Sequence, residues 1–369
     1  MLKIEPRKNR SNFLEVSAPI IAVILTMIFG GFLFLSMGKN PFEAIKLIFW
    51  DPIMSPTFSE YSRPQLVIKA APLILIALGL SFGFRANIWN IGAEGQYIMG
   101  ALFSGSIGLA LYPLDAWFIF PLMILGGIIG GIFWAMIPAI LKIKFNTNEI
   151  LVSLMLVYVA EQILALASVG FLRNPEGLGF PGSRDLSKYP SASNPELIAN
   201  SGIHVGVICS FIAVVFLTYF LTYHRLGFQI KLIGQAPKAA KFSGVNVNYI
   251  VIFCLGLSGG LAGIAGMFEL TGPAGLINID FNVGYGFTAI IVAFLGRLHP
   301  IGILFAGLLM SLTYVGGELA QFMLSIPAAA IQVFQGMLLF FLLSTDLLVS
   351  YKVSLNLGTN NSNPKSKSE

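Results

Sequence analysis

The chain has 369 residues, of which 56% are hydrophobic and 11% are charged. A water-soluble domain carries about a quarter charged residues, so this composition excludes one and predicts a surface in contact with lipid. The net charge of +5 does not indicate a nucleic-acid partner, because lysine and arginine are scattered singly between apolar runs.

The apolar runs predict an all-α, polytopic transmembrane bundle. A bilayer core of about 30 Å needs roughly 20 apolar residues per helix, and about ten segments of the chain meet that length. They are residues 17–37, 66–83, 95–112, 117–141, 149–170, 203–222, 249–270, 281–297, 300–320 and 328–350. An even number of spans places both termini on the same side of the membrane.

The positive charges predict which side that is. With both termini in the cytoplasm, fifteen of the 22 lysines and arginines lie on the inner face and seven on the outer face, as the positive-inside rule requires. The predicted parts are an inner N-terminal segment 1–16, a membrane domain 17–350 with outer loops 38–65 and 171–202 and an inner loop 223–248, and a disordered inner tail 351–369.

The two outer loops differ in composition. Asn40, Pro41 and Glu43 have the spacing of a helix cap, first-turn proline and capping carboxylate, which predicts a short helix along the membrane surface. Residues 173–202 are rich in Pro, Gly, Ser and Asn and predict an irregular loop. This loop either receives a binding protein or is merely solvated.

Glycines spaced four residues apart predict close contacts between helices. The pairs are Gly126 with Gly130, Gly127 with Gly131, Gly256 with Gly260, and Gly259 with Gly263. Small residues at this spacing let helix backbones approach where lipid provides no hydrophobic drive. The pattern indicates a compact bundle and no particular function.

A polar segment at residues 83–96 interrupts the apolar runs. If it is helical, Asn87, Asn90 and Glu94 share one face, but Gly92 and Gly95 favour a break. A broken helix that lines a cavity exposes backbone groups to a solute at membrane depth. The alternative is a plain inner turn between two helices.

The inner loop 223–248 contains signals for a second short helix. Pro237 suits a first helical turn and Gly244 suits a C-terminal cap, so about two turns are predicted between them. So short a helix needs a packing partner. Its predicted apolar face consists of Ala239, Ala240 and Phe242, flanked by Lys238 and Lys241. The alternative is a solvated basic loop.

Few other residues suggest chemistry. Glu161 and Glu269 lie within predicted spans, where a carboxylate is a functional candidate or a buried packing residue. The histidines form no cluster with metal-ligand spacing, so neither a metal site nor a cofactor is predicted. A phosphate-binding G-x4-G-K-[ST] loop is absent from the sequence, so we do not expect the chain to hydrolyse ATP.

Three motifs resemble those of one family. The sequence FRANIWNIGAEGQ at residues 84–96 resembles the signature of permeases in the ribose, nucleoside and branched-chain amino acid branch of ABC importers. The pattern G-x4-A-A-x3-G from Gly234 to Gly244 resembles the loop with which these permeases engage their ATP-binding subunit. The YGF at 285–287 and the LGR at 295–297 resemble segments that family members often carry, and the glycines there would mark another short or broken span near the pore.

This resemblance implies a non-enzymatic subunit that forms half of a translocation path. The solute would be a nucleoside or purine compound first, and a simple sugar second. The implied partners are an ATP-binding subunit, a second and shorter permease, an extracytoplasmic solute-binding protein and the lipid of a bacterial inner membrane. The candidate path residues are Asn87, Trp89, Asn90, Glu94, Gln96 and Glu161, and the candidate coupling residues are Gly234, Pro237, Lys238, Ala239, Ala240, Lys241 and Gly244.

Other functions remain open from the residues alone. An ion-coupled secondary transporter would use Glu94 or Glu161 to bind a proton, but the sequence shows no convincing internal repeat. A branched-chain amino acid permease is the alternative within the same family. An intramembrane enzyme has little support, because no nucleophile and base recur at usable spacing.

Overall fold

The computed structural model describes residues 2–6 and 12–355, and it confirms the all-helical fold. The α-helices are α1 (Asn12–Ser36), α2 (Pro41–Phe49), α3 (Asp51–Met54), α4 (Ser59–Arg85), α5 (Ala93–Ala110), α6 (Ile119–Phe145), α7 (Glu149–Val169), α8 (Val205–Tyr223), α9 (Arg225–Gln235), α10 (Pro237–Phe242), α11 (Val247–Thr271), α12 (Tyr285–Leu295), α13 (Pro300–Leu324) and α14 (Ala328–Ser350). Two 3-10 turns, η1 (Leu186–Lys188) and η2 (Ile279–Phe281), and two strands, β1 (Leu2–Pro6) and β2 (Tyr351–Leu355), complete the described chain. The chain divides into one unit of residues 1–44 and 327–369 and a second unit of residues 45–326.

Most of the long helices can cross a membrane. Among the described residues, eight are long and apolar enough, namely α1, α4, α6, α7, α8, α11, α13 and α14. Every predicted span contains a helix, but α5 is not in this set, and α12 falls outside it with only 11 residues. The number of spans and their orientation therefore stay predictions.

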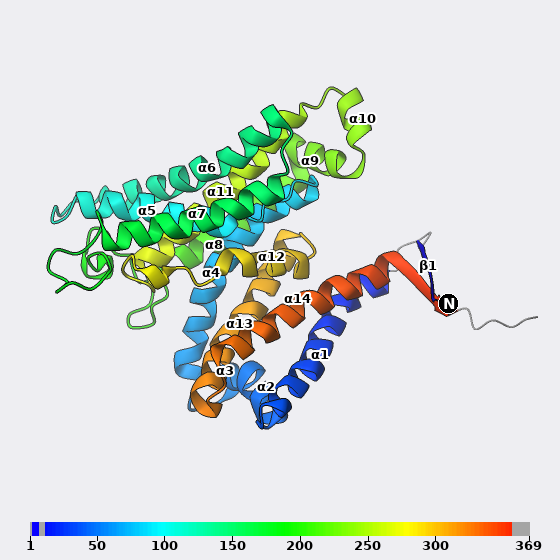
Figure 1. The fold of residues 1–369 in the computed structure, drawn as a ribbon, viewed down its shortest axis with the longest axis horizontal. Coiled ribbons are helices and arrows are strands. Elements are labelled where there is room, and N and C mark those ends of the chain that lie inside the picture. Colours follow the sequence, from blue (N-terminus) through cyan, green and yellow to red (C-terminus); the bar gives the residue numbers. More distant parts are fainter. Residues whose placement is uncertain (1, 7–11, 356–369) are drawn as a thin grey trace, which may run out of the picture. The chain divides into compact units, whose positions relative to one another are not determined.

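The first unit consists mainly of α1 and α14, which lie side by side (Figure 1). The ring of Phe34 stacks on Phe334 at 5.8 Å between centroids, and Phe29 contacts Phe341 at 4.9 Å. Because the partner numbers rise as the α1 numbers fall, the two helices are antiparallel. β1 and β2 also pair in antiparallel fashion.

The terminal segments differ in part from expectation. Helix α1 begins at Asn12, inside the segment 1–16 that was expected to precede the first span. The tail predicted to be disordered over 351–369 begins with β2, because its first five residues pair with β1. Residues 1, 7–11 and 356–369 lie outside the described residues.

In the second unit, α5, α6 and α11 pack along one another (Figure 1). A Cβ at Gly131 would overlap the carbonyl oxygen of Gly259, and a Cβ at Gly263 would overlap that of Gly127. Gly130 faces α5 instead, where a Cβ would lie 2.7 Å from the carbonyl oxygen of Met99. The predicted close contacts are confirmed for the two α6 pairs and for Gly259 with Gly263, and α6 uses its two pairs against two different helices. The prediction was wrong for Gly256 and Gly260, where a Cβ would meet only side-chain atoms at 3.3 Å and 3.4 Å.

The chain reverses direction between α4 and α5 inside the bundle. Along α4, Gly79 lies against Ser258 and Phe82 accepts a bond from Cys254, so this helix runs antiparallel to α11. Helix α5 instead runs parallel to α11. Asn90, just before α5, bonds Ser258, and Gly100 further along α5 contacts Gly263. Ser258 lies about 16 Å along α11 from its first residue, at the helical rise per residue. The reversal therefore packs against the middle of α11 and not against its first turn.

The two segments predicted as outer loops differ in how much regular secondary structure they contain. Residues 38–65 contain α2, α3 and the first turns of α4, and the Asn40 side chain accepts a bond from the Phe42 N–H at 3.1 Å, which confirms the predicted helix cap. Helix α4 begins at Ser59, seven residues before the predicted span. Residues 171–202 are irregular as predicted, with only η1 as a regular element.

Candidate functional site

Two short helices, α9 and α10, form the loop between α8 and α11 and lie at one end of the second unit (Figure 1). Pro237 occupies the first turn of α10, and Gly244 follows the helix with φ +77°. Both positions agree with the sequence, because proline needs no hydrogen-bond partner for its nitrogen there and glycine tolerates a left-handed backbone. The predicted helix of the 223–248 loop is confirmed.

The exposed face of α10 differs from the predicted one. Phe242 is 93% exposed, and Lys238, Ala239 and Lys241 are also exposed. Ala240 is fully buried, so its assignment to the exposed apolar face was wrong. The reason is helix orientation: α10 turns the Ala240 side toward the protein, which a six-residue sequence pattern cannot show. The surface offered by α10 is an aromatic ring beside two lysines.

Helix α9 connects α10 to the end of α4. A Cβ at Gly234 would overlap the carbonyl oxygen of Arg85, so only glycine fits where α9 crosses this point. The pattern residue Gly234 thus has a packing role that the sequence did not reveal. The backbones of α9 and the last turn of α4 are therefore in direct contact at this point.

Arg85 joins a third element to this contact, which we call the Arg85 junction and which consists of Arg85, Gly234 and the turn 296–299. The Arg85 Nε donates to the carbonyl oxygen of Leu298 at 2.9 Å. That turn connects α12 to α13 and holds Arg297 and Leu298 at φ 53° and 56°. Side chains of α8, α9 and the turn surround a cavity of 330 Å³ beside the guanidinium. The junction therefore links α4, α9 and the α12–α13 turn.

Residues 86–92 form the non-helical reversal. Asn87 is exposed with φ 57°, and its side-chain oxygen accepts from the indole Nε1 of Trp89 at 3.1 Å. The Trp89 ring lies against Phe84 at 5.0 Å and Phe294 at 5.8 Å. The Trp89 ring thus stacks on aromatic side chains of α4 and α12 within the protein, which leaves less of its surface for a solute.

Asn90 and Gln96 form a buried hydrogen-bond network. Each is 1% exposed, and the Asn90 amide donates to Gln96 and to Ser258, both at 2.9 Å. The Asn90 oxygen accepts from Gly92 N–H at 3.0 Å and from Gln96 at 3.2 Å. The network holds the reversal against α11, because a buried amide without partners would be costly.

Glu94 is fully buried and caps α12 from another part of the chain. Its carboxylate accepts from the backbone N–H of Gly284 at 3.1 Å and from that of Gly286. A negative charge at the first turn of a helix is favoured by its unpaired N–H groups and by the helix dipole. On the same segment, the side chain of Asn282 donates to Glu161 at 2.7 Å. The two carboxylates therefore fix residues 282–286 from α5 and α7.

A polar and aromatic cluster that the sequence analysis did not assemble lies beyond Glu94. Tyr97 is fully buried, stacks on Phe281 at 5.3 Å, and its hydroxyl has no hydrogen-bond partner among the described residues. Tyr285 contacts Tyr314 at 5.8 Å between rings. Further along α4 and α13, Lys69 forms an ion pair with Glu318. Contacts between distant helices form this cluster. The sequence signal for it was a pair of charged residues, Lys69 and Glu318, within the predicted spans 66–83 and 300–320.

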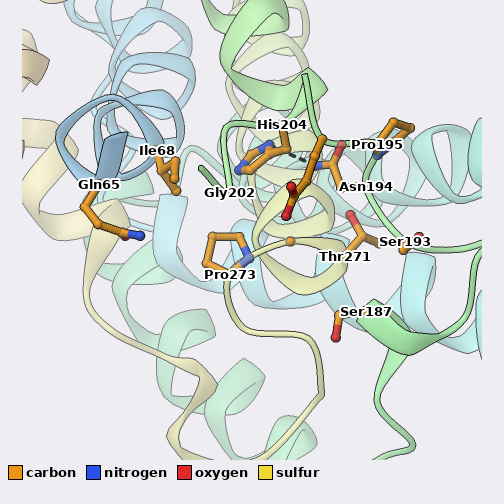
Figure 2. Close-up of a pocket in the computed structure, with 12 residues that line it drawn as sticks. Gln65, Ile68, Ser187, Ser193, Asn194, Pro195, Gly202, His204, Thr271 and Pro273 are labelled. Carbon is orange, nitrogen blue, oxygen red and sulfur yellow. Dashed lines mark hydrogen bonds between the residues drawn. The ribbon is translucent and has the colours of Figure 1, made fainter. Parts of the chain in front are cut away.

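A second cavity has a volume of 340 Å³, and Figure 2 shows the residues that line it. It lies at the opposite end of α4 and α11 from the Arg85 junction. The loop 187–202, the start of α4 and residues 271–273 surround it. His204 on its wall is 3% exposed, and its Nδ1 accepts from the Gly206 N–H at 3.1 Å and contacts the Asn194 amide nitrogen at 2.9 Å. Burial lowers the pKa of His204 to about 4. The ring is therefore neutral at pH 7 and caps α8.

The other two histidines are helix caps as well. The Nδ1 of His224 accepts from Leu226 N–H at 3.2 Å, and that of His299 accepts from Ile301 N–H at 3.3 Å. Among the described residues, no group of three or more His, Cys, Asp and Glu side chains is arranged to hold a metal ion. The histidines thus have structural roles at the starts of α8, α9 and α13.

Comparison with known proteins identifies the family. Residues 63–343 match the family of permease components of the branched-chain amino acid transport system, which is more than half of the chain. The chain belongs to this family. The match confirms the resemblance read from residues 84–96 and 234–244. Together with the span-length helices, it makes the chain a multi-pass membrane permease subunit.

Three curated relatives span nearly the same length. The glucose ABC transporter permease of Haloferax volcanii is 30% identical over 96% of this chain and 94% of its own. The nucleoside ABC transporter permease of Lactococcus lactis is 28% identical over 82% of this chain and 84% of its own. A guanosine ABC transporter permease of Bacillus subtilis is 25% identical over 89% of this chain and 92% of its own. No solved structure matches the chain.

Proposed function

We propose that this chain forms one half of the translocation path of an ATP-driven importer for a nucleoside or a simple sugar. The observation that carries the proposal is α10, a short exposed helix whose partner α9 packs without a gap on Arg85. A separate ATP-binding subunit would dock on Phe242, Lys238 and Lys241. The relatives, which include glucose, nucleoside and guanosine permeases, support the solute class.

The Arg85 junction supplies a route from the docking helix to the path. Movement of α9 would press on the end of α4 and, through the Arg85 guanidinium, on the turn between α12 and α13. Helix α12 is held at its other end by Glu94. A short helix fixed at both ends responds to such a push as a unit, which is the behaviour required of a gate.

The path itself is proposed to run beside α4, α12 and α13. Lys69, Glu318 and Tyr314 supply charged and hydroxyl groups there that a sugar or base can hydrogen-bond. Asn87, Trp89 and Glu161 stay candidate path residues, because each is at least partly exposed. Asn90, Glu94 and Gln96 are proposed to position the path, since their polar atoms bond within the protein.

The proposed assembly has three further proteins. An ATP-binding subunit hydrolyses ATP, a second and shorter permease completes the path, and an extracytoplasmic binding protein delivers the solute. The termini, α9 and α10 then lie in the cytoplasm of a bacterial cell, and the chain itself needs no cofactor.

Uptake by energised cells tests the proposal against its rival. Labelled guanosine and glucose are supplied to cells with and without the gene, and ATP is depleted or the proton gradient is collapsed separately. ATP-dependent uptake of either compound that survives the protonophore is expected. Uptake that survives ATP depletion and fails with the protonophore would instead establish an ion-coupled transporter, and uptake of labelled leucine alone would establish the amino acid alternative.

A further inference from the structure

A cavity of 530 Å³ lies between the end of α5 and the segment that follows α7. Its wall is partly apolar and partly basic. The lining residues are Ser106, Leu109, Ala110, Tyr112, Phe171, Leu172, Arg173, Pro175 and Arg184. The proposed translocation route does not use any of them.

Two guanidinium groups face this cavity, one with partners in the protein and one without partners among the described residues. Arg184 is oriented, because its Cζ lies 4.5 Å from the centre of the Tyr112 ring and its Nη2 lies 3.0 Å from a carboxylate oxygen of Glu176. The side chain of Arg173 makes no hydrogen bond or ion pair with any residue that the structure describes. One carboxylate therefore balances two arginines, and the cavity keeps a net positive charge.

The cavity lies at the end of a span-length helix. Helix α7 is one of the span-length helices, and its last turn exposes Leu166 and Val169 by 66% and 53%. Phe171, two residues further, is 70% exposed and lines the cavity. Large apolar side chains at the end of a span face lipid, and the basic groups just beyond them lie at headgroup level.

We propose that this cavity binds an anionic phospholipid, with its phosphate between Arg173 and Arg184 and its acyl chains against Leu109 and Phe171. Planar guanidinium groups donate paired hydrogen bonds to phosphate oxygens. The apolar wall beside them favours a lipid over inorganic phosphate, which has no apolar part. The inference depends neither on the solute nor on which side of the membrane the cavity faces.

Native mass spectrometry of the purified full chain tests the site. The protein is reconstituted in nanodiscs of phosphatidylcholine with a minor fraction of phosphatidylglycerol, and the lipid retained after mild delipidation is counted. Wild-type protein is expected to retain phosphatidylglycerol. Arg173→Gln and Arg184→Gln are each expected to lower its retention about tenfold, the effect of losing one charge-assisted bond, whereas Arg173→Lys lowers it less because the charge remains.

Lys188→Gln is the matched control. It removes a cation from the same loop, where Lys188 pairs with Asp185 at 3.1 Å outside the cavity, and it should leave retention unchanged. Circular dichroism melting of each variant confirms that it folds. Equal retention by wild type and both glutamine variants would overturn the proposal. Displacement of the lipid by millimolar inorganic phosphate would overturn it as well, because that result indicates a simple anion site.

Discussion

The carbonyl oxygen of Arg85 lies directly against Gly234, with no room for a side chain between α4 and α9. The backbone of the loop that carries α10 therefore touches the last turn of a membrane helix. Because Arg85 also bonds Leu298, this one contact joins three elements that are far apart in the sequence. In our account, it converts movement of a docked subunit into movement of the path.

Gly234→Ala should uncouple the transporter. The added methyl group overlaps the Arg85 carbonyl, so α9 must shift, at a typical cost of about 1–3 kcal/mol for overpacking. We expect uptake in membrane vesicles to fall at least tenfold while ATP hydrolysis by the assembled complex persists. Gly336→Ala is the control, because nothing lies within 4 Å of its Cβ. Equal uptake by both variants would show that the contact transmits nothing.

Glu94→Gln should weaken the start of α12. Glutamine is neutral and keeps one acceptor oxygen, so both N–H groups at Gly284 and Gly286 lose a charged partner and one of them loses its acceptor. The expected loss of stability is about 2 kcal/mol, the usual value for a bond to a charged group. Thermal unfolding in detergent measures it, with the exposed Glu60→Gln as control. An unchanged midpoint would mean that the carboxylate does not hold α12.

Asn90→Ala separates positioning from solute contact. The change removes four hydrogen bonds around Gln96, Ser258 and Gly92, so we expect destabilisation of about 2–3 kcal/mol. If Asn90 contacts the solute instead, KM for uptake would rise while the unfolding midpoint stays constant. Measuring both quantities on the same variant decides between the two roles.

His204 should make the region around its cavity sensitive to acid. Its pKa is about 4 when folded and about 6.5 when unfolded, so the unfolded form binds more protons between these values. Stability then decreases as pH falls from about 6.5 to about 4, by up to about 3 kcal/mol. Hydrogen exchange of residues 187–207 should accelerate over this range. His204→Asn keeps the helix cap and should remove the pH dependence, so an equal acceleration in that variant would refute the assignment.

The sequence predicted those features that depend on neighbouring residues. Pro237 and Gly244 set the limits of α10, and the glycines of α6 and α11 indicated a close crossing, because helix signals and four-residue spacing are local. The inward direction of Ala240 was missed, since it depends on how α10 packs.

The contacts between distant elements could not be predicted in the same way. Glu94 meets Gly286 across 192 positions, and Arg85 meets Leu298 across 213. No spacing rule connects residues so far apart. The sequence identified the polar segment 83–96 as important, and the assignment of Asn90, Glu94 and Gln96 to the solute path stays a prediction. Their hydrogen bonds within the protein could not be predicted from the sequence.

Photo-crosslinking from α10 tests the central claim most directly. A photoreactive amino acid replaces Phe242, which is 93% exposed, and in a separate variant Ala239. Trp117, 85% exposed beside α6, is the control position. Illumination of intact cells should capture a nucleotide-hydrolysing subunit from positions 242 and 239 and not from 117. Capture of no such subunit from either α10 position, in cells that transport the solute, would contradict the account.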